Sequence, residues 1–245
     1  MRTFVIGDLH GNLKGFNQAI ERSPIDYDKD RLIFLGDYVD GWSESSELVD
    51  LLCHMVDEGF NFITLLGNHD DWCKDWLHTG NAFKGWTMNG GQSTIDSYIK
   101  TGFILGERAE RHRQFFRSLH NYFIDDNRAF VHGGYSSFKG LGHDHTSIYT
   151  WDRDLWERNA LPGNIKDMPK LLRPYKEIFI GHTSTQNWNT DKPMNACNVW
   201  NLDTGGGWNG RVTIMDVDTK EYWQSDRSDE LYPDEHGRGG YKKRS

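Results

Sequence analysis

This sequence has few cysteines, and it lacks long hydrophobic runs and an excess of basic charge. Its three cysteines among 245 residues are odd in number and far apart, so they indicate neither a disulfide framework nor a Cys-x-x-Cys metal motif. No apolar run approaches the roughly 18 residues of a membrane-spanning helix, and the first apolar stretch is too short for a signal peptide. We therefore expect a cytoplasmic protein in a reducing environment, without a membrane partner.

The charge balance argues against nucleic acid as a partner. Lys and Arg number 28 against 36 Asp and Glu, which gives a net charge of −8, and the pI is near 5.7. Proteins that bind nucleic acid through electrostatic attraction have a basic surface instead. Aromatic residues make up 13% of the chain, with 10 tryptophans. That content is too high for a disordered protein and favours a folded domain with a substantial core.

Short apolar runs alternate with helical patterns in the first part of the chain, which favours parallel strand–helix–strand units. The expected helices there are Asn12–Arg22 and Ser45–Glu58. The expected strands over the whole chain are Thr3–Gly7, Arg31–Gly36, Asn61–Gly67, Arg128–His132, Glu177–Gly181, Val199–Asp203, Arg211–Asp216 and Glu221–Gln224.

The rest of the chain fits one domain over residues 1–225. Residues 70–120 have a mostly helical pattern. The glycines at 205–207 suggest a turn between antiparallel strands. Residues 226–245 have mixed charges and few apolar side chains, and we expect them to form a mobile C-terminal tail.

Five of the apolar runs end in the same way, with glycine and a polar side chain just past the end of the strand. Ligands of open α/β sheets bind at these carboxyl ends. A single motif of this kind is usually a turn, but five in sequence favour a functional site. The five motifs are Gly7-Asp8-Leu9-His10-Gly11, Gly36-Asp37-Tyr38-Val39-Asp40, Gly67-Asn68-His69-Asp70, His132-Gly133-Gly134 and Gly181-His182-Thr183.

The side chains collected in this way are typical metal ligands. They are Asp8, His10, Asp37, Asn68, His132 and His182. Oxygen and imidazole donors without thiolates suit divalent Mn, Fe, Zn or Ni better than Ca or Mg. Six ligands are too many for one catalytic ion with an open position. They fit two ions about 3.5–4 Å apart with a bridging carboxylate, for which Asp37 is the candidate.

In this order the motifs resemble those of the calcineurin-like metallophosphoesterases, and within them the phosphoprotein phosphatase branch. Trp86-Thr87-Met88-Asn89-Gly90-Gly91 and Trp151-Asp152-Arg153-Asp154 are similar to stretches of bacterial and phage Ser/Thr protein phosphatases and of symmetrical diadenosine tetraphosphatases. The resemblance covers residues 1 to about 218. It implies an α/β fold, a four-layer α/β/β/α sandwich with mixed sheets and a dinuclear metal centre at the sheet edges.

The resemblance also implies a role for each polar residue. It assigns Asp8 and His10 to the first metal ion, Asp37 to both, and Asn68, His132 and His182 to the second. His69 would then be the general acid that protonates the leaving group, with Asp40 holding its imidazole, because an alkoxide or phosphate must be protonated as it departs.

One departure from the family pattern concerns phosphate binding. The family usually follows Gly-Asp-x-Val-Asp with an arginine that clamps the substrate phosphate, whereas here the motif continues with Gly41 and Trp42. Arg153 matches a second family arginine and is the remaining candidate for this contact, or else a surface ion-pair residue. Asn89 is either a further donor to phosphate or a turn residue.

The predicted activity is hydrolysis of phosphate monoesters by direct attack of a hydroxide that bridges the two metal ions. The first candidate substrate is a protein phosphorylated on serine or threonine, and on tyrosine as an extension. The alternative is a dinucleoside polyphosphate of the diadenosine tetraphosphate type, or another small phosphoester. A non-catalytic metal-binding scaffold is a third hypothesis, which rests only on the missing arginine.

Overall fold

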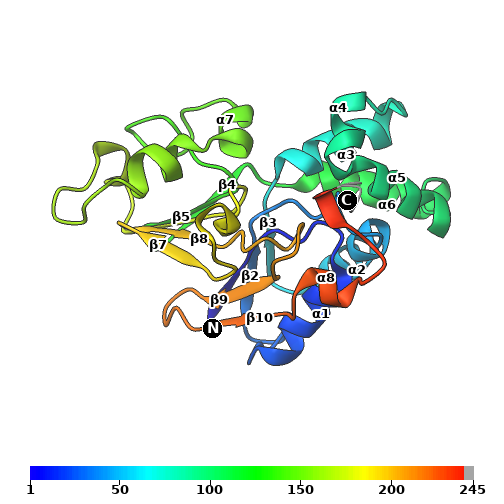
Figure 1. The fold of residues 1–245 in the computed structure, drawn as a ribbon, viewed down its shortest axis with the longest axis horizontal. Helices are drawn as coiled ribbons and strands as arrows, with labels where there is room; N and C mark the ends of the chain where they lie inside the picture. The colour runs from blue at the N-terminus through cyan, green and yellow to red at the C-terminus, as the bar shows by residue number, and fades with distance from the viewer. Residues whose placement is uncertain (240–245) are drawn as a thin grey trace, which may run out of the picture.

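Two mixed five-stranded sheets face each other at the centre of the molecule (Figure 1). The structure is a computed structural model that describes residues 1–239. The first sheet, in the order β10-β9-β1-β2-β3, contains β1 (Thr3–Ile6), β2 (Arg31–Phe34), β3 (Phe62–Thr64), β9 (Thr213–Asp216) and β10 (Tyr222–Gln224). The second, in the order β4-β5-β6-β8-β7, contains β4 (Tyr122–Asp125), β5 (Arg128–Val131), β6 (Glu177–Ile180), β7 (Met194–Ala196) and β8 (Val199–Asn201).

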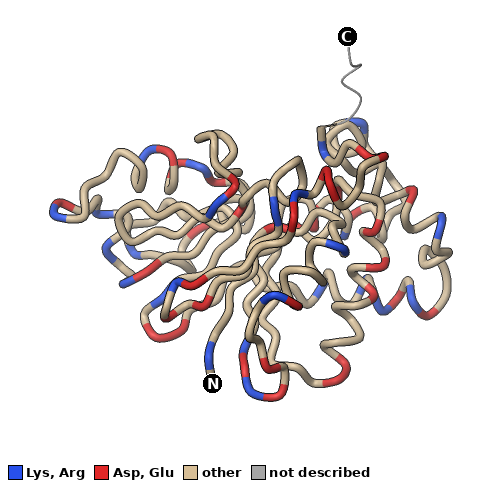
Figure 2. Tube along the Cα trace, turned by 60° about the horizontal axis from the view of Figure 1, so that its bottom comes forward, with Lys and Arg blue, Asp and Glu red and all other residues tan. Residues whose placement is uncertain are grey.

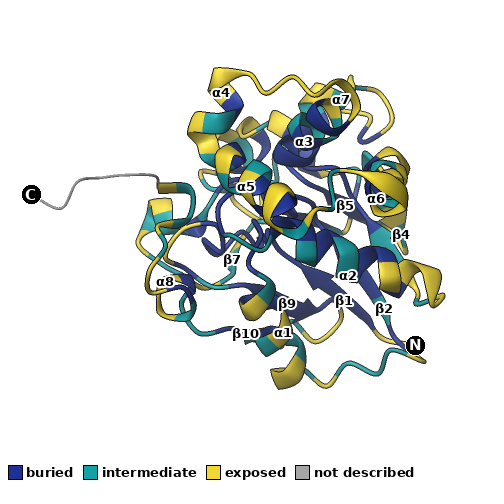
Figure 3. Cartoon of the chain, turned by 90° about the vertical axis from the view of Figure 1, so that its right-hand side faces the viewer, coloured by how far each residue is buried: buried dark blue, intermediate teal, exposed yellow. Residues whose placement is uncertain are grey.

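Helices cover the outer faces of the two sheets. The α-helices are α1 (Leu13–Arg22), α2 (Ser45–Asp57), α3 (Asn68–Thr79), α4 (Lys84–Trp86), α5 (Gln92–Thr101), α6 (Gly106–Ser118), α7 (Thr146–Trp151) and α8 (Ser228–Leu231). In Figure 3 the strands are mostly buried, and exposed positions gather on the outer helices and loops. No helix within residues 1–239 is long and apolar enough to cross a membrane.

Three apolar clusters hold these layers together. The middle cluster joins the two sheets, and in it Phe130 and Phe179 stack with ring centroids 5.0 Å apart against Val5 and Ile33. A second cluster packs the first sheet against α1, α2, α3, α5 and α6. A third packs the second sheet against α7 and the turns that follow it. The expected four-layer α/β/β/α arrangement with mixed sheets is therefore confirmed.

All eight expected strands are present, and β1, β2 and β3 are parallel as expected. Two short strands, β4 and β7, are additional. β4 pairs with β5 through a two-residue turn at Asp126 and Asn127, whose φ values of 47° and 56° are typical of a type I′ hairpin. An Asp-Asn pair is a sequence signal for such a turn.

The expected antiparallel pairing across the glycines at 205–207 is wrong. β8 and β9, which flank these glycines, lie in different sheets, and β9 pairs with β1 and β10 instead. Because a run of glycines permits many backbone paths, it predicts a turn without fixing which strand comes next to which.

The segment expected to be a mobile tail makes specific contacts over its described part, residues 226–239. Ser228 is buried, and its Oγ donates to the carbonyl of Gly206 at 2.9 Å. Tyr232 is 2% exposed and stacks on Trp42, with ring centroids 5.0 Å apart. Residues 240–245 lie outside the described residues, and the domain boundary at residue 225 stays a prediction.

Acidic and basic positions are interspersed along the trace (Figure 2).

Candidate active site and metal centre

The six predicted metal ligands lie together at the carboxyl ends of parallel strands of both sheets. Asp8 follows β1, Asp37 follows β2 and Asn68 opens α3 after β3, while His132 follows β5 and His182 follows β6. All are buried, none being more than 6% exposed. Parallel strands end at one edge of a sheet, and the two sheets bring these edges together.

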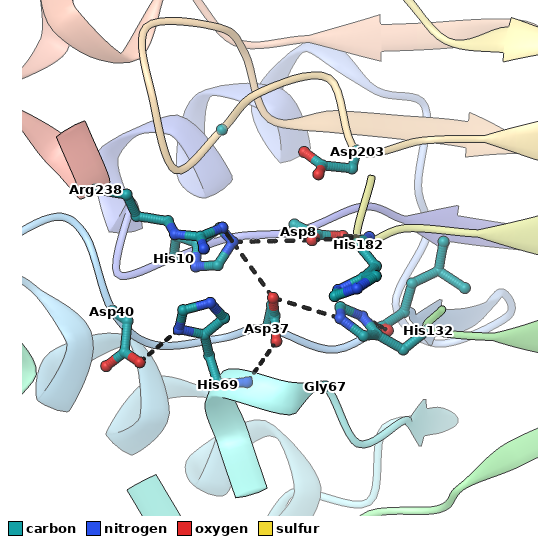
Figure 4. A network of polar contacts seen from close by, with 12 residues as sticks. Asp8, His10, Asp37, Asp40, Gly67, His69, His132, His182, Asp203 and Arg238 are labelled. Carbon is teal, nitrogen blue, oxygen red and sulfur yellow. Dashed lines mark hydrogen bonds and ion pairs between the residues drawn. The ribbon is translucent and has the colours of Figure 1, made fainter. Parts of the chain in front are cut away.

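Asp37 lies at the centre of this group (Figure 4). Its Oδ2 is 3.5 Å from Nε2 of His10 and 3.4 Å from Nε2 of His132. Two sets of three ligand atoms lie within 4.8 Å of one another, and both include Asp37: Asp8, His10, Asp37 and Asp37, His132, His182. The geometry therefore offers two adjacent cation positions that share one carboxylate.

Backbone carbonyls orient two of the imidazoles toward this centre. Nδ1 of His10 is 2.9 Å from the carbonyl oxygen of Val39, and Nδ1 of His132 is 2.9 Å from that of Leu35. Since a carbonyl only accepts, each Nδ1 carries a proton and each Nε2 is turned toward the centre. Such a partner behind the ring is typical of metal-binding histidines.

Two glycines make the close approach of the carboxylates possible. A Cβ added at Gly67 would lie 2.1 Å from Oδ1 of Asp37, and one added at Gly181 would lie 2.1 Å from Oδ1 of Asp8. Gly67 and Gly181 are thus explained by contacts between neighbouring strand ends rather than by a left-handed backbone of their own.

Four residues of the site have a left-handed backbone. The φ values are 50° for His10, 55° for Asp37, 72° for Asp40 and 65° for His182. Such conformations cost roughly 1–3 kcal/mol each in non-glycine residues and cluster at functional sites. Their concentration here indicates that the fold holds these loops against local preference.

Burial dominates the electrostatics of the centre. It lowers the pKa of His10 and of His182 well below the usual range, so that both rings are neutral, the form that binds metal. Burial, with the nearby Asp203 carboxylate, raises the pKa of Asp8 well above its usual range. Burial by itself lowers the pKa of His132, but the Asp37 carboxylate raises it to about 9. A metal ion that binds there must therefore displace a proton.

The donor set fits divalent metal ions. Nε2 of His182 is buried and has no hydrogen-bond partner in the structure, although a buried polar atom of this kind is costly to leave unpaired. Carboxylates, an amide oxygen and neutral imidazoles are also the ligands that Mn, Fe, Zn and Ni accept. The clusters could hold two such ions, with Asn68 beside the second, where its Oδ1 is 3.2 Å from Nε2 of His132.

Metal binding is expected to stabilise the fold measurably. At a free Mn²⁺ concentration about a hundredfold above the Kd, one site contributes about 2.7 kcal/mol, which corresponds to a rise in Tm of about 5–10 °C for a chain of this size. Scanning calorimetry with Mn²⁺ and with EDTA measures this shift, and elemental analysis should find two equivalents. An unchanged Tm together with no bound metal would show that the clusters are not a metal centre.

The predicted acid and its partner are also in contact. Nδ1 of His69 is 2.7 Å from Oδ2 of Asp40, and both side chains are almost fully buried. The His69 ring lies edge-on to His10 at 5.1 Å, next to the metal cluster but outside both ligand sets. This arrangement leaves Nε2 of His69 as the atom that can carry a proton to a leaving group.

Two residues that the sequence analysis missed anchor Asp40. The Trp86 indole N–H donates to Oδ2 at 2.6 Å, and the Thr94 hydroxyl donates to Oδ1 at 2.7 Å. Both residues are fully buried. The carboxylate that orients His69 is thus itself fixed by two buried side chains.

Removing the Thr94 hydroxyl is expected to lower both the free energy of unfolding and the catalytic contribution of His69. Thr94→Val keeps the shape but leaves one Asp40 oxygen unpaired, which costs about 1–3 kcal/mol of unfolding free energy. Chemical denaturation measures this loss, and kcat for esters with poor leaving groups should fall with it. Thr94→Ser, which keeps the hydroxyl, is the matched control, and equal stability of both variants would contradict the role of this hydrogen bond.

The two residues predicted to donate hydrogen bonds to phosphate lie in different surroundings. Arg153 lies on the site: its Nη1 donates to the Thr183 hydroxyl at 3.0 Å and to the His182 carbonyl at 3.2 Å. Asn89 is exposed and donates to the Gly85 carbonyl at 2.7 Å, as a turn residue does. A substrate-binding role stays a prediction for both.

A cavity of about 450 Å³ opens beside the cluster, and only Arg153 and His182 of its lining residues were predicted. Its lining includes Arg153, His182, Asp203, Trp208 and Arg238. Asp203 follows β8, as the other acids follow their strands, and it is 3% exposed. Its motif, Leu202-Asp203-Thr204-Gly205, lacks the glycine before the acid that marked the others.

Comparisons with known proteins agree with this geometry. A family model described as calcineurin-like phosphoesterase matches residues 1–208. A symmetrical bis(5'-nucleosyl)-tetraphosphatase of Pseudomonas fluorescens is 26% identical over 90% of this chain and 93% of its own. Serine/threonine-protein phosphatase 2 of Salmonella typhimurium is 23% identical over 87% and 92%, respectively. The crystal structure of a metallophosphoesterase from Sphaerobacter thermophilus superposes with a TM-score of 0.54, covering 93% of this chain and 88% of that one at 19% identity.

Proposed function

The chain belongs to the calcineurin-like phosphoesterase family, and from that premise we propose that it hydrolyses dinucleoside polyphosphates with two divalent metal ions, manganese being the first candidate. The observation that carries the hydrolytic part is the pair of three-ligand clusters that share Asp37, with the His69–Asp40 pair beside them. This combination suits a reaction in which phosphorus is attacked and a leaving group is protonated.

The metal ions would be held by the residues already predicted. Asp8 and His10 would bind one ion, Asn68, His132 and His182 the other, and Asp37 both. When bound, two such ions would lower the pKa of a water molecule and neutralise the negative charge of the phosphate. The protein itself contributes the fixed orientation of the imidazoles, the exclusion of water by burial, and a proton at Nε2 of His69 for the leaving oxygen.

Exposed aromatic rings at the site favour a substrate with planar groups. Trp151, 42% exposed, lies against Trp72 and His182, and Trp72 lies against His69. On another element, Trp208 is 39% exposed and lines the cavity with two arginines. Aromatic rings stack nucleobases with about 1–3 kcal/mol per base. Two exposed aromatic surfaces at the site, one of them in a cavity that two arginines also line, support a substrate that has two bases joined by phosphates.

A phosphoprotein is the second candidate substrate, and the similarity to the Salmonella protein phosphatase favours it. The sequence motifs alone placed this substrate first. The proposed location is the cytoplasm, because all three cysteines are free.

A panel of substrates tests the proposal. Enzyme loaded with Mn²⁺ should cleave diadenosine tetraphosphate with a higher kcat/KM than a phosphoserine or phosphotyrosine peptide, with p-nitrophenyl phosphate as the reference. The opposite order would favour the phosphoprotein. Binding of two metal ions without turnover of any of these compounds would support a non-catalytic scaffold instead.

A further inference from the structure

Arg238 reaches the centre of the site from the far end of the chain. Its Nη1 is 3.3 Å from Nε2 of His10, a residue 228 positions away (Figure 4). Its guanidinium carbon lies 5.2 Å from the ring centroid of Trp208, and its side chain lines the cavity that Arg153 and His182 also line. The family match ends at residue 208, so this residue lies outside the part of the chain that the family model covers.

Arg238 shares its cavity with the Asp203 carboxylate and interacts with it electrostatically, but the two side chains do not form an ion pair. Among residues 1–239, no carboxylate lies within ion-pair distance of Arg238, and its buried Nε has no hydrogen-bond partner. The contact with His10 is to an imidazole nitrogen that belongs to a metal-ligand set. A half-buried cation with unused N–H groups is stable when an anion completes its hydrogen bonds.

The space that Arg238 fills is the one left open at position 41. A Cβ added at Gly41 would lie 3.1 Å from Cγ of Arg238, and the φ of 134° at Gly41 disfavours any side chain there. Gly207 is similar, since its Cβ would lie 2.9 Å from Cδ of Arg238. Two glycines of separate loops therefore form the channel through which the arginine enters the site.

The C-terminal segment, residues 228–239, is fixed so that the arginine is held in this channel. The Arg238 amide donates to the Gly207 carbonyl at 2.8 Å. Glu235 accepts from the amide and hydroxyl of Ser43 at 3.0 and 2.6 Å. Tyr232 stacks on Trp42 and donates to Glu44. The loop that follows Asp40 thus serves as the docking surface for this segment.

We propose that Arg238, together with Arg153, binds the phosphoryl oxygens of the substrate, so that the C-terminal segment completes the active site. Arg153 uses Nη1 for Thr183 and His182, and no contact within residues 1–239 occupies its Nε or Nη2. Two guanidiniums facing one cavity suit a multiply charged phosphate, because each can donate two parallel hydrogen bonds. The proposal rests on the proposed phosphoester hydrolase function.

Binding of inorganic phosphate to the Mn²⁺-loaded protein tests the proposal without turnover. Isothermal titration should give a Kd that is about 10- to 100-fold higher for Arg238→Ala than for the wild type, as expected for lost charged hydrogen bonds. The Kd of Arg238→Lys should lie between these two values, because an ammonium keeps the charge but cannot donate two parallel hydrogen bonds as a guanidinium does. Arg227→Ala is the control, because this arginine lies directly before the segment and pairs with Asp229 instead.

Tyr232→Ala tests whether the segment positions the arginine. It should weaken phosphate binding as Arg238→Ala does, and the double variant should be little worse than either, because both remove one contact. Unchanged phosphate affinity of Arg238→Ala with both metal ions retained would overturn the proposal. Loss of metal from that variant would also overturn it, by making His10 the target of the arginine. A wild type that binds phosphate but hydrolyses no ester would reject the proposed function alone.

Discussion

Asp37→Asn is expected to lose both metal ions and to lower kcat/KM by about 10³-fold or more, with the fold retained. Metal ions contribute several kcal/mol to phosphoryl chemistry, and each 1.36 kcal/mol is about tenfold in rate. The carboxylate is the one group common to both ligand sets, so an amide there removes the negative charge between two cations. In the wild type the His69 amide donates to Oδ1 of Asp37 at 3.0 Å. The side-chain oxygen of asparagine can accept the same hydrogen bond, so the local backbone conformation should be kept.

Metal content, circular dichroism and turnover of p-nitrophenyl phosphate should be measured together for this variant. The control is Asp28→Asn, an aspartate exposed in the loop between α1 and β2, which should bind two metal ions and react like the wild type. An Asp37→Asn variant that binds two metal ions and has normal turnover would contradict the bridging role of Asp37. Loss of the folded far-UV spectrum would point to a structural role instead.

His69→Asn is expected to separate protonation from metal binding. General acid catalysis is worth about 10²–10⁴-fold, so kcat should fall by that factor for esters whose leaving group is an alkoxide. For p-nitrophenyl phosphate the loss should be much smaller, because nitrophenolate leaves without a proton. Both metal ions should stay bound, since His69 lies outside the two ligand sets.

The comparison of two leaving groups is the informative measurement here. His54→Asn, at an exposed position of α2, is the matched control and should behave as the wild type on both substrates. Equal losses on both esters would remove His69 from the role of acid. Loss of metal from His69→Asn would instead make it a ligand.

The sequence predicted eight of the ten strands, and the polar side chains that the fold gathers at their ends, because both are local features. A ligand such as Asp8 or His182 follows its own strand directly, and parallel pairing brings all such strand ends to one edge. Once the strands are known, the metal ligands are therefore brought close together. Short strands without a clear apolar alternation, β4 and β7, carry too weak a signal and were missed.

Local features also misled where several backbone paths share one pattern. The glycines at 205–207 were expected to join an antiparallel pair, yet the chain crosses there from one sheet to the other. The polar composition after residue 225 suggested mobility, while Tyr232 in that segment is buried against Trp42. A single aromatic ring that finds a complementary surface can order a polar segment, and composition does not reveal that surface.

The sequence by itself predicted eight of the strands and the candidate metal ligands, because these depend on residues within a few positions of a strand end, and the family resemblance added the His69–Asp40 pair. Only the tertiary structure decided what supports and completes the site. Thr94 reaches Asp40 across 54 positions, and Arg238 reaches His10 across 228. Such contacts depend on how loops and helices pack, and no spacing along the chain encodes them. The sequence pattern lacks an arginine at position 41, whereas in the folded chain the side chain of Arg238 fills the space beside Gly41.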